Sequence, residues 1–147
     1  MLKKIFPTTL IIILIFLCNI SASAKTIKVR MLNKGETGSM IFEPSFISVE
    51  IGDTIIFQST DKGHNVQNIK GMLPEGVKSF KSKINDDYSF VPKKEGLYGL
   101  KCTPHYGMGM VALVQVGKPL NLQKTRSKRH PGKAKKRFAD LFDKIKN

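Results

Sequence analysis

The feature that most limits how this chain can fold is an apolar pattern with a period near two, which runs from residue 25 to residue 117. Clusters of Gly, Pro, Asn and Asp interrupt it, and the stretches between them are rich in Val, Ile, Phe and Tyr. Strand side chains alternate between the two faces of a sheet, so the pattern predicts an all-β domain of two packed sheets or a barrel. The expected strands are residues 27–31, 45–50, 54–59, 88–91, 97–102 and 110–116, with a loop over 33–39, turns at 52–53 and 94–96, and an irregular connection at 72–76.

The start of the chain departs from this pattern. Lys3 and Lys4 precede an apolar run over residues 5–20, which the small residues Ala22, Ser23 and Ala24 follow. This arrangement is typical of a secretory signal peptide, and we expect cleavage after Ala24. The run is short for a transmembrane helix, so no membrane span is expected.

The end of the chain departs from it too. Beyond residue 117 the sequence becomes a basic tail in which Phe138, Leu141, Phe142 and Ile145 fall at the spacing of one helix face. A shorter helical stretch is predicted near residues 121–127. We therefore divide the chain into a signal peptide (1–24), a β-sandwich (25–117) and a helical extension (118–147) packed on the same domain.

The net charge of the chain indicates which kinds of partner it could bind. Residues 25–147 carry 23 Lys and Arg against 11 Asp and Glu, a net charge of +12. Such an excess favours an acidic protein, a nucleic acid or a membrane surface as partner, and export argues against nucleic acid.

Cys102 is the one cysteine beyond the signal peptide, so the exported chain is expected to hold a single thiol and no internal disulfide.

Chemistry is concentrated in residues 101–110, where Cys102, His105, Met108 and Met110 follow a predicted strand. A Cys and a His with two residues between them can turn inward on one ion, and a Met on the returning strand can approach it from the side. A second imidazole would come from His64, because it follows a strand and a glycine turn whereas His130 lies in the basic tail. Two His and one Cys with a weak axial Met form the type 1 copper site of electron-transfer proteins.

Each of these residues also has an ordinary interpretation. A lone buried Cys commonly acts as a small hydrophobic residue, and a lone His commonly forms a hydrogen bond in a loop. The remaining methionines, Met31, Met40 and Met72, are interpreted as packing residues. Copper ligation is favoured because the residue types occur together.

Several segments resemble those of the pseudoazurins, small periplasmic cupredoxins, and the likeness extends over residues 25–147. They are 31–35 (MLNKG), 42–44 (FEP), 61–66 (DKGHNV), 80–85 (FKSKIN) and 101–106 (KCTPHY). The resemblance implies an eight-stranded Greek-key sandwich, and electron exit through His105 within an apolar patch ringed by lysines. It also implies that Asn65 ties the two ligand loops together by hydrogen bonds.

The fourth ligand has two candidates. Met108 gives the shorter spacing of amicyanin-like proteins, and Met110 gives the spacing of plastocyanin and pseudoazurin. We choose Met110, because it begins the final predicted strand and the pseudoazurin resemblance covers far more of the chain. The predicted metal ligands are therefore His64, Cys102, His105 and Met110, holding one copper ion.

The function expected from this site is one-electron transfer by Cu(I)/Cu(II) cycling in the periplasm, without enzymatic activity. The resemblance implies delivery to nitrite reductase or another denitrification reductase from a cytochrome-type donor. The basic charge predicts docking to an acidic patch on that partner, and a carrier that must dock and leave is most simply a monomer. Two rival interpretations are a copper-handling protein, which stores or delivers the ion, and a thiol enzyme with Cys102 as nucleophile and His105 as base. The latter lacks a third orienting group.

Overall fold

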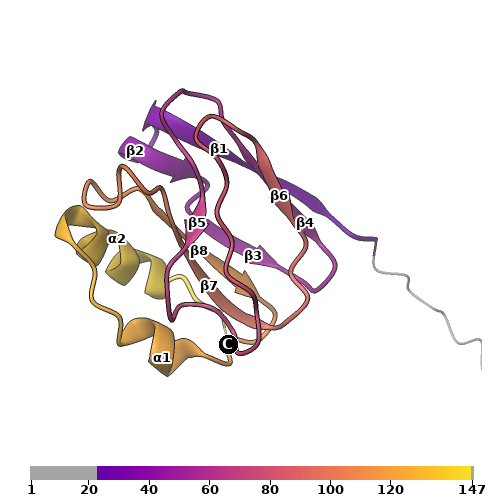
Figure 1. Ribbon diagram of the computed structural model, residues 1–147. Coiled ribbons are helices and arrows are strands. Elements are labelled where there is room, and N and C mark those ends of the chain that lie inside the picture. Colours follow the sequence, from indigo (N-terminus) through magenta and orange to yellow (C-terminus); the bar gives the residue numbers. More distant parts are fainter. Residues whose placement is uncertain (1–22, 147) are drawn as a thin grey trace, which may run out of the picture.

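The alternating strands form two four-stranded sheets in the computed structural model, which describes residues 23–146 (Figure 1). One sheet has the order β2-β1-β4-β6, with β1 Thr26–Gly35, β2 Gly38–Glu43, β4 Thr54–Gln58 and β6 Tyr88–Phe90. The other has the order β3-β8-β7-β5, with β3 Phe46–Val49, β5 Gln67–Asn68, β7 Gly96–Lys101 and β8 Val111–Val116. The predicted all-β sandwich of eight strands with a helical tail is confirmed.

The main core lies between the two sheets. Val29 and Phe57 are neighbours in the parallel pairing of β1 with β4, and both side chains are fully buried. Val114 of β8 belongs to the same buried cluster, as do Cys102 and Met110. Two of the predicted ligands are thus anchored in the hydrophobic core rather than in a surface loop.

The outer face of the second sheet is covered by the tail. Helix α1 spans Leu122–Arg126 and lies against β7, and helix α2 spans Gly132–Phe142 and lies against β8 (Figure 1). Phe138 and Leu141 of α2 pack with Val111 and Leu113 of β8 in a second buried cluster. Every residue of β8 is therefore buried, which explains why its sequence is apolar apart from Gln115, whose side chain is hydrogen-bonded to the backbone of Gly117 and Lys146.

The predicted loop over residues 33–39 is wrong. β1 continues to Gly35 and β2 begins at Gly38, so Glu36 and Thr37 alone form the connection. This hairpin lies at the edge of its sheet, where one face of the strands is exposed and polar residues weaken the alternating signal. The two-residue strand β5 was too short to predict from periodicity.

The ends of the chain add two facts. The signal peptide predicted for residues 1–24 lies outside the described residues, apart from Ser23 and Ala24. Within residues 23–146, no helix combines the length and the apolar character that crossing a bilayer requires.

Candidate metal centre

The backbone brings the candidate ligands to one end of the sandwich. Cys102 directly follows β7, and Met110 directly precedes β8, so the ligand loop, residues 102–110, joins two paired strands. The Cys102 N–H donates to the Met110 carbonyl at 2.9 Å, and the Met110 N–H donates to the His105 carbonyl at 3.1 Å. These bonds close the loop on itself and fix where its side chains lie.

Three donor atoms converge at this end. The separations are 3.1 Å between Nδ1 of His64 and Nδ1 of His105, 3.8 Å from Cys102 Sγ to His64 Nδ1, and 3.5 Å from Cys102 Sγ to His105 Nδ1. A point equidistant from atoms so separated lies inside their triangle, about 2.0 Å from each, which is a normal metal–nitrogen distance. Within residues 23–146, this is the one such cluster of His, Cys and acidic ligand atoms. His130, the third histidine, is instead hydrogen-bonded to Tyr106.

A hydrogen bond to Asn33 sets the orientation of the His64 ring. Its Nε2 lies 3.0 Å from the side-chain oxygen of Asn33, which can only accept a hydrogen bond, so Nε2 carries the proton. The Nδ1 lone pair is then free to face Cys102 and His105. Asn33 is itself held by its backbone N–H, which donates to the carboxylate of Asp61 at 2.6 Å.

Burial makes a cationic His64 unfavourable. Its side chain is fully buried, and this burial lowers the pKa of the imidazole, with the nearby His105 lowering it further and Asp61 opposing both. A neutral imidazole is the form that binds a metal ion.

The two ligand segments are tied together by Asn65, as the resemblance implied. The Thr103 N–H donates to the side-chain oxygen of Asn65 at 2.8 Å, and the Asn65 amide donates to Thr103 Oγ1 at 3.1 Å. Burial raises the pKa of the Cys102 thiol, whereas the backbone N–H groups of Asn65 and His105 lower it. Asn65 thus lies where it fixes the loops and where its backbone favours a thiolate.

A third segment supports the turn that carries His64. Asn85 accepts from the Gly63 N–H at 2.6 Å, and its own N–H donates to the His64 carbonyl at 2.9 Å. Ser82 makes a matching pair of bonds with Val66. These hydrogen bonds hold the backbone on both sides of His64, at Gly63 and at Val66.

The two candidate methionines differ in burial. Met110 is fully buried in the cluster that contains Cys102, whereas Met108 is 49 % exposed. The Met110 thioether lies in the same buried cluster as the Cys102 thiol and the Met108 side chain does not, so the structure favours Met110 over Met108 as the fourth ligand. Met31 and Met72 are buried packing residues.

The donor set suits copper better than the other common metals. A thiolate and two imidazoles with a buried thioether beside them combine soft and intermediate ligands, which Cu(I) and Cu(II) both accept. Structural zinc more often has several thiolates, and magnesium and calcium prefer oxygen ligands. The arrangement offers little room for the ligands to rearrange between oxidation states.

Sequence reasoning missed Asn33, Ser82 and Asn85. Asn33 was placed in an expected loop, although it belongs to β1 and lies against His64. Ser82 and Asn85 belonged to a segment that resembles the pseudoazurins, yet no local pattern assigned them a partner. Each acts across 16 to 31 residues of sequence, so only a fold could reveal it.

Comparisons with known proteins agree with this geometry. Residues 29–117 match the family model described as copper binding proteins, plastocyanin/azurin family. A pseudoazurin of Paracoccus pantotrophus is 58% identical over 116 residues, which cover 78% of this chain and 80% of the relative. A pseudoazurin of Methylorubrum extorquens is 46% identical over 125 residues, which cover 84% of each chain.

A solved structure gives the same result for the fold. The crystal structure of native pseudoazurin from Hyphomicrobium denitrificans superposes with a TM-score of 0.80 at 46% identity, and the match covers 83% of this chain and 99% of that one. The chain therefore belongs to the plastocyanin/azurin family of copper-binding proteins and, within it, to the pseudoazurins, which are electron-carrying cupredoxins rather than enzymes.

Proposed function

We propose that this chain is a periplasmic one-electron carrier in which His64, Cys102, His105 and Met110 hold one type 1 copper ion. The observation that carries the proposal is the convergence of Cys102 Sγ with the Nδ1 atoms of both histidines, around a point where a metal ion fits. When bound, copper supplies the one-electron redox couple. The protein supplies a fixed set of ligands.

The rigidity of that set supports electron transfer over copper storage. His64 is held by Asn33, and Cys102 and Met110 are joined through the backbone. Asn65 holds Thr103, directly after the thiol. Ligands that are held in place change little between oxidation states, which favours fast electron exchange, whereas a protein that delivers copper needs a site that opens.

His105 is the expected exit for the electron. It is partly exposed, while His64 and Cys102 are fully buried. Exposed apolar residues lie on the adjoining segments, with Pro104 and Ile84 lining one shallow hollow and Met108 in the ligand loop. An apolar contact around the least buried ligand allows a partner to approach the centre closely.

Charge around this surface supports an acidic partner. Four lysines lie within two residues of Asn33, His64, Ser82 or Cys102 in the sequence, and they are Lys34, Lys62, Lys83 and Lys101. Within the part of the chain that the structure describes, none of them is in an ion pair. We infer docking to an acidic patch on nitrite reductase or another denitrification reductase, with a cytochrome-type donor, by a monomeric carrier.

The test of the copper site is the visible spectrum of the protein from Lys25 onward, recorded after addition of Cu(II) and again after a mild reductant. The expected result is an intense blue band that bleaches on reduction and is absent from Cys102→Ser. Pale or colourless copper binding would refute the type 1 centre and favour copper handling.

The test of docking is the rate of electron transfer to a nitrite reductase at increasing ionic strength. We expect the second-order rate constant to fall with added salt. At low ionic strength we expect it to be lower in Lys62→Glu than in the unsubstituted protein. Lys118→Glu is the matched control, because it makes the same charge change beyond the far end of β8. Equal rates for both variants would exclude docking at the His64 end.

A further inference from the structure

One short segment of the tail contacts the ligand loop at three places. The segment is residues 130–137, which we call the tail clamp. The Tyr106 hydroxyl lies 2.7 Å from His130 Nδ1, the Gly107 carbonyl accepts from the Lys133 N–H at 3.0 Å, and the Gly109 carbonyl accepts from Arg137 Nη1 at 2.8 Å. Nearly every residue between His105 and Met110 is therefore held from outside the sandwich.

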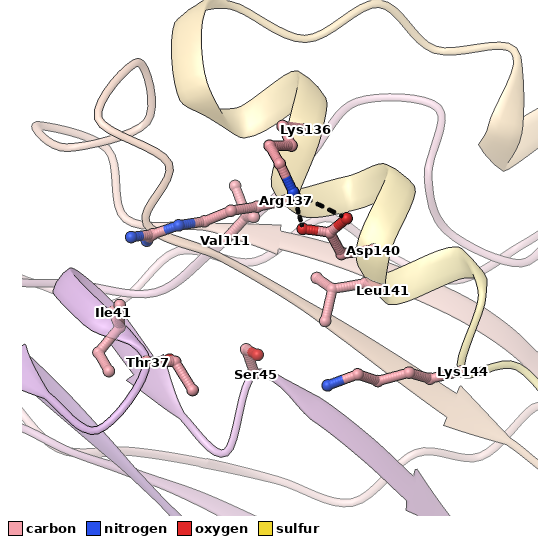
Figure 2. A pocket seen from close by; sticks show the side chains of 9 residues that line it. All are labelled: Thr37, Ile41, Ser45, Val111, Lys136, Arg137, Asp140, Leu141 and Lys144. Carbon is pink, nitrogen blue, oxygen red and sulfur yellow. Dashed lines mark hydrogen bonds and ion pairs between the residues drawn. The ribbon is translucent and has the colours of Figure 1, made fainter.

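Arg137 has the most specific of these contacts. Its Nη1 also donates to the Met40 carbonyl at 2.8 Å, and its Nη2 donates to the Ser39 carbonyl at 2.9 Å. Its two ion-pair-forming neighbours on the helix, Lys136 and Asp140, pair with each other instead. Figure 2 shows the Arg137 side chain extending from α2 away from that pair.

The chemistry of these contacts requires a guanidinium. Arg137 is partly buried, and its guanidinium donates to three backbone carbonyls from two separate segments rather than to a carboxylate. A guanidinium presents its donors in a fixed planar fork, so it can hold several carbonyls in one geometry. The single ammonium of a lysine cannot reproduce that fork.

Glycines on both sides show that the approach is close. A Cβ on Gly109, where φ is +92°, would lie 2.9 Å from Arg137 Cδ, and a Cβ on Gly38 would lie 3.3 Å from Arg137 Nη2. A Cβ on Gly132 would lie 2.3 Å from the Gly107 carbonyl oxygen. The helix and the ligand loop thus approach each other closely at Gly109 and at Gly132.

We propose that Arg137 is a positioning residue for the metal centre, because it ties Gly109 to β2 and so fixes the return of the ligand loop at Met110. Met110 follows Gly109 directly, and its backbone is bonded to both Cys102 and His105. Any shift of Gly109 is passed to the buried methionine. This inference rests on the proposed copper site for its effect on the metal, whereas the contacts of Arg137 are made to protein carbonyls.

The first measurement is amide hydrogen exchange of the metal-free protein, compared between wild type, Arg137→Met and Arg137→Lys. Loss of one charged hydrogen-bonding group raises the population of the locally open ligand loop about tenfold. The Met110 amide is therefore expected to exchange about tenfold faster in Arg137→Met. Arg137→Lys should lie between it and wild type. Lys136→Met is the matched control, since Lys136 is exposed and its side-chain ammonium pairs with Asp140 rather than with the ligand loop.

The second measurement uses the copper-loaded protein. We expect Arg137→Met to change the visible spectrum and the reduction potential, both of which respond to the axial ligand, while Lys136→Met leaves the spectrum unchanged. The proposal would be overturned if the Met110 amide exchanged at the same rate in Arg137→Met and Lys136→Met. It would also be overturned if the exchange rates in Arg137→Met rose equally over β1 and β4. A wild type that binds copper without a blue band would refute the proposed function, and the exchange result would still decide whether Arg137 holds the loop.

Discussion

The contact between Asn33 and His64 offers a quantitative test of how the centre is pre-organised. In Asn33→Ala the buried Nε2–H of His64 loses its acceptor, and the imidazole loses the contact that selects its tautomer. Removal of such outer partners typically weakens metal binding 10- to 100-fold. Asn33 itself is exposed, so water can replace part of the lost bond, and we expect the lower end, about tenfold.

The same reasoning gives the effect on the metal-free protein. A neutral hydrogen bond that water can partly replace contributes about 1 kcal/mol, so the free energy of unfolding should fall by about that amount. Copper affinity would be measured by competition with a coloured chelator, and stability by urea denaturation. Lys34→Ala is the control, because Lys34 is exposed next to Asn33, and the ring nitrogens of His64 lie against Asn33, Cys102 and His105 instead. If Asn33→Ala bound copper as tightly as Lys34→Ala, the idea that Asn33 orients His64 would be refuted.

Three further predictions concern the tail and the loop. Phe138→Ala should destabilise the metal-free protein by about 3–5 kcal/mol in urea denaturation, because the ring is 1% exposed and its loss leaves a cavity under α2. Gly109→Ala should cost about 1–2 kcal/mol in the same assay, since its φ of +92° disfavours a side chain, whereas Gly107→Ala, where a Cβ meets nothing, should be close to neutral. Burial lowers the pKa of His130, so the unfolded chain takes up the proton first and stability should fall as the pH drops below about 6.5. His130→Phe should flatten that decline, and an unchanged pH profile would show that another group causes it.

The candidate ligands could be predicted because their signal is local. Cys102, His105 and Met110 lie within nine residues, at the end of a strand that the alternating pattern marks clearly. His64 could be added because the described chain has few histidines to choose from. The apolar spacing of Phe138, Leu141 and Phe142 likewise predicted a helix packed on the sandwich, and the structure places that helix against β8.

The contacts that support the ligands could not be predicted in this way. Arg137 is 97 residues from Met40, and nothing in a run of basic residues distinguishes the one that contacts carbonyls from those that face water. Asn33 was missed because the hairpin of β1 and β2 lies at a sheet edge, where polar residues resemble a loop. Periodicity reports which side of an element is buried, and it does not report which polar groups meet across the fold.

The pairing of Lys101 with Val111 completes the sheet before the ligand loop begins. For the sheet alone, the loop is an insertion whose length is free to vary, and a shorter or longer version would leave β7 and β8 intact. The tail clamp removes that freedom, because each of its contacts reaches a particular residue of the loop. A change in loop length would therefore have to be accompanied by a change in the C-terminal segment, so the two should be exchanged as one unit when chimaeras with other cupredoxins are built.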